Sequence, residues 1–160
     1  LGAVGMRPQV AKVFTDRAFP GGLTYNSHPL ACATALATLA VYEEEDLIAR
    51  AARTGEILRS RLQALQRKHP SVGATRSIGL FGLVELVRNR RTYEPMAPYG
   101  GTSDEMAAIG RFFREHGLYT FVRFNTFFTN PPLVISEEQL DEGLAIIDQA
   151  LDITDKAVGN

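Results

Sequence analysis

The segment of this chain best suited to chemistry runs from residue 21 to residue 29 and reads GGLTYNSHP. Its two glycines leave the backbone open to close approach by a ligand, and Thr24 offers a hydroxyl group. Pro29 then favours the first turn of a helix, whose free N–H groups attract anions. Many loops lead into helices in this way, so the residue types alone indicate an anion-binding turn without naming its ligand.

The exact sequence of this segment is more specific than its residue types. Residues 23–29, followed at once by an alanine-rich run, resemble the loop of class III aminotransferases, which are pyridoxal-phosphate (PLP) enzymes of fold type I. The resemblance implies that Thr24 reaches across a dimer interface and binds the cofactor phosphate of the neighbouring subunit, and that Tyr25 borders the cofactor. Many members carry glycine where this chain has Ser27, so the local turn is expected to differ. The sequence is most similar to those of the branch that includes taurine–pyruvate and ω-amino-acid–pyruvate aminotransferases.

A second candidate site residue is Arg123. Residues 117–123 and 131–135 resemble the family's terminal strand and Pro-Pro step, and in relatives an arginine on this strand binds the substrate carboxylate. A guanidinium group offers two parallel donors to a carboxylate. Some relatives place that arginine where this chain has Phe121, and a shift of two residues keeps Arg123 on the same face of a strand. Arg123 is therefore either the carboxylate ligand or part of a surface or interface salt bridge.

The resemblance also implies groups for which the chain has no convincing candidate. PLP enzymes of this type need a Schiff-base lysine, an aspartate for the pyridine nitrogen and a glycine-rich phosphate loop. The lysine is expected upstream of Leu1, because residues 1–4 resemble the strand that follows it. Lys12 lies in a Val-Ala-Lys-Val setting that does not resemble the Schiff-base site. The chain alone is therefore expected to be inactive.

For several other residues the sequence favours a structural role over a functional one. His28 is expected to be satisfied by backbone groups of its loop, although a place near the cofactor stays open. Cys32 is expected to be a small core residue. Arg88, Arg90 and Arg91 form a short basic run that is typical of a solvated loop.

Composition narrows the class of protein. The chain has 160 residues, of which 45% are hydrophobic and 22% charged, as in soluble globular domains. The net charge of -1 offers no electrostatic basis for binding nucleic acid or an anionic membrane. Its single cysteine excludes an internal disulfide and fits a reducing compartment, so we expect a cytoplasmic protein. The first residue is not methionine, and residues 1–6 read as a buried strand, so we expect the C-terminal part of a longer protein.

Apolar periodicity and capping residues predict the elements that position these groups. Helices are expected at residues 29–44, 46–68 and about 103–116, with a last helix that begins after Ser136 in a capping box. Strands are expected at residues 79–87, 118–124 and 127–130. Residues 88–101 should form a surface loop.

These expectations define an α/β protein. Residues 1–45 should be the trailing segment of a large PLP-binding domain, and residues 46–160 a C-terminal small α+β domain with helices packed on a short, mostly antiparallel sheet. The implied activity is the transfer of an amino group from an ω-amino acid or amine to pyruvate or another 2-oxo acid, by a homodimer or higher homo-oligomer. The alternative is a stand-alone, non-catalytic binding or oligomerisation module of the same fold.

Overall fold

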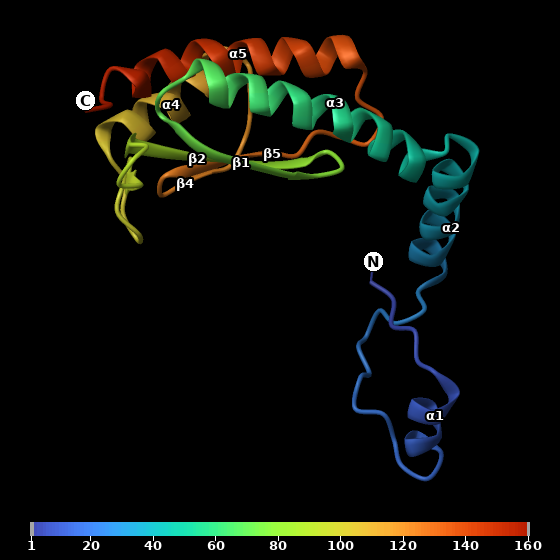
Figure 1. Ribbon diagram of the computed structural model, residues 1–160. Helices are drawn as coiled ribbons and strands as arrows, with labels where there is room; N and C mark the ends of the chain where they lie inside the picture. Colours follow the sequence, from blue (N-terminus) through green and yellow to red (C-terminus); the bar gives the residue numbers. More distant parts are fainter. Residues whose placement is uncertain (1, 160) are drawn as a thin grey trace. The chain divides into compact units, whose positions relative to one another are not determined.

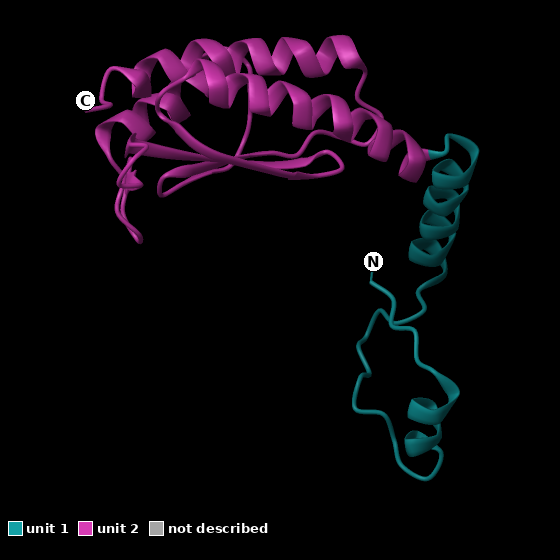
Figure 2. Ribbon diagram, in the orientation of Figure 1, with its two compact units in different colours: residues 1–46 teal, residues 47–160 magenta. Residues whose placement is uncertain are grey.

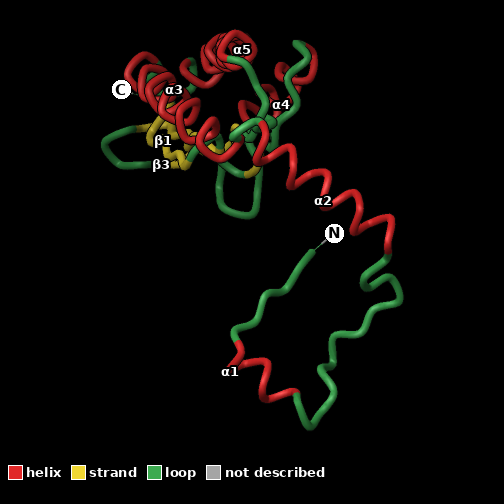
Figure 3. Tube along the Cα trace, turned by 90° about the vertical axis from the view of Figure 1, so that its right-hand side faces the viewer, coloured by secondary structure: helices red, strands yellow, loops and turns green. Residues whose placement is uncertain are grey.

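The computed structural model describes residues 2–159, and the chain forms two units, residues 1–46 and residues 47–160 (Figure 2). Unit 1 contains the short helix α1 (Pro8–Ala11), the 3-10 turn η1 (Lys12–Phe14) and the helix α2 (Pro29–Glu44). Loops connect these elements (Figure 3). No described residue of unit 1 is buried, so this unit has no core of its own.

The expectation of a buried strand at the start of the chain is not met. Residues 2–6 are irregular and exposed, and Leu1 lies outside the described residues. The physical reason is that a buried strand needs neighbouring strands, and the described residues of unit 1 form none. The helix α2, by contrast, has the predicted bounds, because Pro29 starts it and alanines continue it.

Along the chain, unit 2 consists of a long helix, then a β-hairpin, and then a helix, a second hairpin and a last helix. Its elements are α3 (Leu47–Lys68), β1 (Val72–Ile78), β2 (Phe81–Asn89), β3 (Glu94–Pro95), α4 (Asp104–Glu115), β4 (Val122–Arg123), β5 (Thr126–Thr129) and α5 (Glu137–Asp155). The sheet has the order β1-β2-β5-β4, and β3 also pairs with β2. All pairs are antiparallel, as expected. The helices lie on one face of this sheet (Figure 1).

The core of unit 2 lies between the helices and the sheet. In α3, Leu58 and Leu62 repeat at helical spacing and are 0% and 1% exposed. On the sheet, Val84 pairs with Phe127, and both are fully buried. The ring of Phe127 meets that of Phe113 edge to face, with centroids 5.4 Å apart. The sheet and all three helices therefore share one core.

Capping residues begin two helices of unit 2 where the sequence predicts. The Ser103 hydroxyl accepts a hydrogen bond from the Met106 N–H at the start of α4. At the start of α5, Ser136 and Gln139 exchange two hydrogen bonds in a capping box. The strand β1 was not predicted, and the strand expected at residues 118–124 is reduced to Val122–Arg123. Within the described residues, no helix combines the length and the apolar character that a membrane crossing requires.

Candidate functional site

The loop before α2 is built from two consecutive turns. The Asn26 N–H donates to the Leu23 carbonyl at 3.0 Å, and the His28 N–H donates to the Tyr25 carbonyl at 3.3 Å. The Asn26 side chain joins the turn to the start of the loop by donating a hydrogen bond to the Gly21 carbonyl at 3.0 Å. These bonds leave Thr24 and Tyr25 exposed within the first turn. The sequence folds this way because Asn and Gly favour turns.

Ser27 adopts a backbone conformation that favours glycine. Its φ is 56°, in the left-handed region, where a side chain with a Cβ is strained. Ser27 is therefore a strained position of this turn. The expected difference from the family's loop stays a prediction.

The start of α2 presents free backbone donors. His28 is the N-cap residue, and no side chain caps the helix. The first intrahelical bond of this end runs from the Cys32 N–H to the His28 carbonyl, so the N–H groups of the first turn have no partner within the helix. The His28 ring lies 5.8 Å from the Tyr25 ring, centroid to centroid. The rings of Tyr25 and His28 and free amides thus lie at one helix end, which suits an anionic group next to a ring.

A hollow of about 860 Å³ adjoins this helix end within unit 1. Its lining includes Gly2, Ala3, Tyr25, His28 and residues of α2 from Leu30 to Leu39. No lysine, aspartate or glutamate lines it among the described residues. The lysines of the chain lie elsewhere: Lys12 in η1, Lys68 paired with Asp148 at 2.5 Å, and Lys156 at the end of α5. The free amides beside Tyr25 and His28 therefore fit the phosphate end of a PLP group, whereas Thr24 does not line this hollow and no described residue of its lining supplies the groups for the opposite end.

Arg123 lies beside the hairpin turn between β4 and β5. Its guanidinium carbon is 4.7 Å from the centroid of the Phe124 ring, which is a cation–π contact. It is exposed and makes no ion pair with any residue that the structure describes. Its carbonyl accepts a hydrogen bond of 2.8 Å from the Thr126 hydroxyl, which holds the turn.

Phe121 occupies a different environment from Arg123. It lines a hollow of about 690 Å³ together with Phe81 and Phe128. The rings of Phe121 and Phe128 are 5.6 Å apart. This hollow is lined mostly by apolar side chains, and Arg123 is not part of its lining. An arginine at position 121 would thus adjoin an apolar hollow, whereas Arg123, in β4, is exposed to solvent.

One further cluster of possible metal ligands lies in unit 2. The ligand atoms of His69, Asp152 and Asp155 all come within 4.8 Å of one another. The Nδ1 atom of His69 is 2.7 Å from an oxygen of Asp155, which is hydrogen-bonding distance. We treat this group as a hydrogen-bonded cluster, because its atoms already bind one another. The sequence alone did not predict this cluster, because its one indication there is a histidine directly after a helix.

Comparison with known proteins identifies the family. Residues 1–151 match the profile of the class III aminotransferases. The chain belongs to this family. It is 34% identical over 164 aligned positions to the putrescine–pyruvate aminotransferase of Pseudomonas aeruginosa, with 99% of this chain and 34% of that protein covered. It is 36% identical to the 5-aminovalerate aminotransferase of the same organism, over 86% of this chain and 32% of that protein.

A solved structure extends the likeness to three dimensions. The taurine:2-oxoglutarate aminotransferase of Bifidobacterium kashiwanohense, in complex with PLP and glutamate, matches with a TM-score of 0.87 and 37% identity. The match covers 93% of this chain and 33% of that one. The fold is thus that of fold-type-I PLP enzymes, and the cofactor of the family is PLP, as expected. This class III chain spans about a third of the length of the relatives it matches.

Proposed function

We propose that this chain acts as the C-terminal part of a PLP-dependent aminotransferase. The larger protein would move an amino group from an ω-amino acid or an amine to pyruvate or another 2-oxo acid. The observation that carries the proposal is the loop of residues 21–28, whose exposed threonine and free helix amides adjoin the N-terminus of α2. Relatives named for putrescine, 5-aminovalerate and taurine support the ω-amino substrate class.

In this proposal the chain supplies the phosphate end of the site. Thr24 would donate its hydroxyl hydrogen to the cofactor phosphate, and the first amides of α2 would face the same anion. Tyr25 would border the ring. When bound, PLP supplies an electron sink for the negative charge that develops next to the amino nitrogen. The lysine that holds the cofactor and moves the proton would lie upstream of Leu1.

The burial pattern of unit 1 supports its place inside a larger protein. The helix α2 carries no charged residue before Glu43, and its apolar residues are spread around the helix. A helix that is apolar on all sides is normally buried, yet Leu30, Leu36 and Leu39 are 73%, 68% and 59% exposed. We propose that residues 1–45 belong to the large PLP-binding domain and that residues 46–160 form the C-terminal small domain.

The partner of this surface follows from the role of Thr24. A threonine that serves the cofactor of a neighbouring subunit requires at least a homodimer, so we propose a homodimer or higher homo-oligomer. The small side chains along α2 favour close approach of another backbone. We also propose a cytoplasmic location, for which the lone Cys32 is the supporting observation.

The threonine proposal is tested in the full-length protein. We expect Thr24→Ala to weaken PLP retention by about tenfold, because one hydrogen bond to a charged group is lost. Dialysis followed by the absorption spectrum of the remaining cofactor measures this loss. Thr102→Ala removes a hydroxyl from an exposed loop of unit 2 and is the matched control. If both variants keep the cofactor equally well, Thr24 has no part in the site.

The role of Arg123 is a separate proposal. We propose that it binds the carboxylate of the 2-oxo acid, since its guanidinium group is exposed and free of ion pairs with described residues. Arg123→Ala should then lower kcat/KM for pyruvate by about 10- to 100-fold, while an uncharged amine is spared. Arg111→Ala, on the exposed side of α4, is the control. Equal losses for both substrates would assign Arg123 to the stability of its hairpin.

The alternative function is a stand-alone, non-catalytic module. It is favoured by one observation: none of the described lysines lines the hollow beside the loop. The DNA upstream of the codon for Leu1 separates the two proposals. An in-frame continuation that encodes a Schiff-base lysine supports the enzyme, whereas a start codon close to Leu1 without a partner gene supports the module. Borohydride treatment of the purified chain with PLP adds a second test, because a lysine trapped within residues 1–160 contradicts the proposed division of the site.

A further inference from the structure

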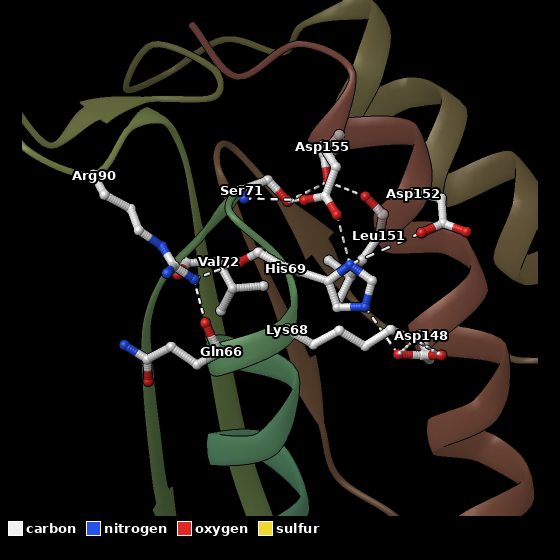
Figure 4. Close-up of polar contacts among 11 residues, drawn as sticks. Gln66, Lys68, His69, Ser71, Val72, Arg90, Asp148, Leu151, Asp152 and Asp155 are labelled. Atoms are coloured by element: carbon white, nitrogen blue, oxygen red, sulfur yellow. Dashed lines mark hydrogen bonds and ion pairs between the residues drawn. The ribbon is translucent and has the colours of Figure 1, made fainter. Parts of the chain in front are cut away.

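A buried histidine joins the end of α3 to the last turns of α5. His69 follows α3 directly and is 1% exposed. Figure 4 shows its ring between Asp148 and Asp155, two carboxylates of α5. Buried polar groups are costly unless they are hydrogen-bonded, so the partners of this ring decide what it does.

Both ring nitrogens of His69 face carboxylate oxygens. Nδ1 is 2.7 Å from Oδ2 of Asp155, and Nε2 is 2.8 Å from Oδ1 of Asp148. An ionised carboxylate can only accept hydrogen bonds. A neutral imidazole has one donor nitrogen and one acceptor nitrogen, so it could satisfy only one of these contacts. Both contacts are hydrogen bonds only if both nitrogens carry hydrogen.

Other donors hold the two carboxylates in their accepting role. Oδ1 of Asp155 accepts from the Ser71 N–H at 3.0 Å and from the Ser71 hydroxyl at 2.6 Å. Asp148 accepts from Lys68 Nζ at 2.5 Å. Burial alone would raise the pKa of Asp148, but the hydrogen bonds from His69 and Lys68 outweigh it, and the pKa lies below its usual value. Asp148 is therefore ionised at neutral pH.

The balance of charge around the ring supports the same conclusion. The helix α5 contributes three carboxylates, those of Asp148, Asp152 and Asp155, and Lys68 faces them from α3. Arg90, at the end of β2, donates instead to the carbonyls of Gln66, His69 and Val72 and so holds the turn after α3. With a charged ring, His69 and Lys68 together face three carboxylates. With a neutral ring, Lys68 alone would face all three.

We infer that His69 carries hydrogen on both ring nitrogens and, by donating to both carboxylates, clamps the end of α3 to α5. Deprotonation turns one ring nitrogen into an acceptor that faces a carboxylate oxygen. Two acceptors at hydrogen-bonding distance repel each other, so α5 and the turn at Ser71 would separate.

Nitrogen-15 NMR of the histidine rings tests the inference without any substitution. In the full chain at neutral pH, we expect two ring N–H signals from His69, both slow to exchange because the ring is buried. His28 and His116 supply reference signals from other parts of the chain. A single ring N–H signal from His69, with the other nitrogen unprotonated, overturns the inference, because the proton would then lie on a carboxyl group.

Two substitutions on α5 provide a matched pair. Asp155→Asn places an amide N–H or a single accepting oxygen opposite His69 Nδ1, while Ser71 competes for the oxygen. We expect the ring to lose its second N–H signal. Asp152→Asn removes the same charge from the same helix, but its carboxylate lies 4.0 Å from Nδ1 and is 70% exposed, so both signals should remain. Identical spectra for the two variants contradict the clamp.

Hydrogen exchange connects the ring to the helices. At one neutral pH, amide protection in residues 69–72 and in the last turns of α5 should be about tenfold lower in Asp155→Asn than in the parent chain. In Asp152→Asn the protection should be unchanged. If Asp155→Asn loses its second ring N–H signal and keeps full protection, His69 is not a clamp.

Discussion

Single residues in this chain carry charges whose neighbours fix their protonation. Glu105 at the start of α4 accepts two hydrogen bonds from Arg88, at 3.1 and 2.8 Å. These bonds, followed by the backbone N–H of Glu105 itself, lower the pKa of this carboxyl group from 4.5 to about 2. The side chains of Arg88 and Glu105 are only 32% and 25% exposed, so solvent screens the pair incompletely.

This pair predicts a specific dependence of stability on pH. Because the folded-state pKa is depressed, the contribution is present above pH 4.5 and is lost as the pH falls towards about 2. Glu105→Gln should cost about 2 kcal/mol at pH 7, after allowance for solvent screening. The difference from the parent should shrink on acidification. Urea unfolding at several pH values measures it, with Glu115→Gln at the exposed end of the same helix as the control. A pH-independent difference would show that packing, not charge, dominates at this site.

Whole elements of unit 2 are held together by close backbone approach as well as by apolar side chains. Gly55 of α3 is buried, and a Cβ built on it would lie 2.6 Å from the backbone of Gly79. The turn between β1 and β2 thus packs directly against the helix. Gly143 of α5 differs, because a Cβ there would meet only Leu118 Cδ1 at 3.8 Å, an ordinary contact.

These two glycines predict opposite effects of the same substitution. Alanine is favoured over glycine inside a helix by about 1 kcal/mol, so Gly143→Ala should raise the free energy of unfolding by about that amount. At position 55 the clash is with backbone that cannot rotate away, so Gly55→Ala should lower it by roughly 1–3 kcal/mol. Thermal unfolding of both variants gives the comparison. A stabilised Gly55→Ala variant would mean that the turn at Gly79 yields easily.

The helices were more predictable from sequence than the strands. The bounds of α2 and the capping box at Ser136 follow from local residues, so the structure confirms them. The strand β1 contains Gly73, Ser77 and few apolar residues, and it exists because β2 supplies its hydrogen bonds. Similarly, the strand expected at residues 1–6 has no neighbouring strand among the described residues of unit 1. Strand formation depends on partners that a local pattern does not contain.

The candidate site was predictable only in part. The residue types of the loop, including a serine at position 27, could be interpreted from the sequence. The positive φ of Ser27 could be found only in the structure. The two contacts of the His69 ring come from residues 79 and 86 positions away in the sequence. No spacing rule within a single helix predicts such a pair. The roles of Thr24, Tyr25 and Arg123 stay predictions until the variants are measured.

At the scale of the whole molecule, the two units should differ sharply in stability. Every described buried residue lies in unit 2, beginning with Leu47. A fragment of residues 47–160 should therefore unfold within about 3 °C of the full chain, because it keeps the entire core. Residues 1–46 alone should give the circular dichroism of a largely unfolded peptide, since short helices without packing are marginal.

Hydrogen exchange on the intact chain gives an independent measurement of the same difference. Amides of α2 should exchange quickly and those of α3, β2 and α5 slowly. The exposed leucines of α2 should also promote self-association, which light scattering detects. Slow exchange in α2 of a monodisperse monomer would contradict the proposal that this helix needs a further protein surface.

The position of β5 in the sheet has a consequence for synthesis. This strand lies between β2 and β4, and α5, which follows it, contributes Leu140, Leu144, Ile147 and Leu151 to the core. The ribosome delivers the chain from its N-terminus, so β1 and β2 emerge long before the elements that complete their layer. Unit 2 consequently cannot finish folding until its last helix has been released. A premature stop codon anywhere in α5 should therefore leave a nascent chain with an uncovered apolar sheet, which cellular quality control would degrade.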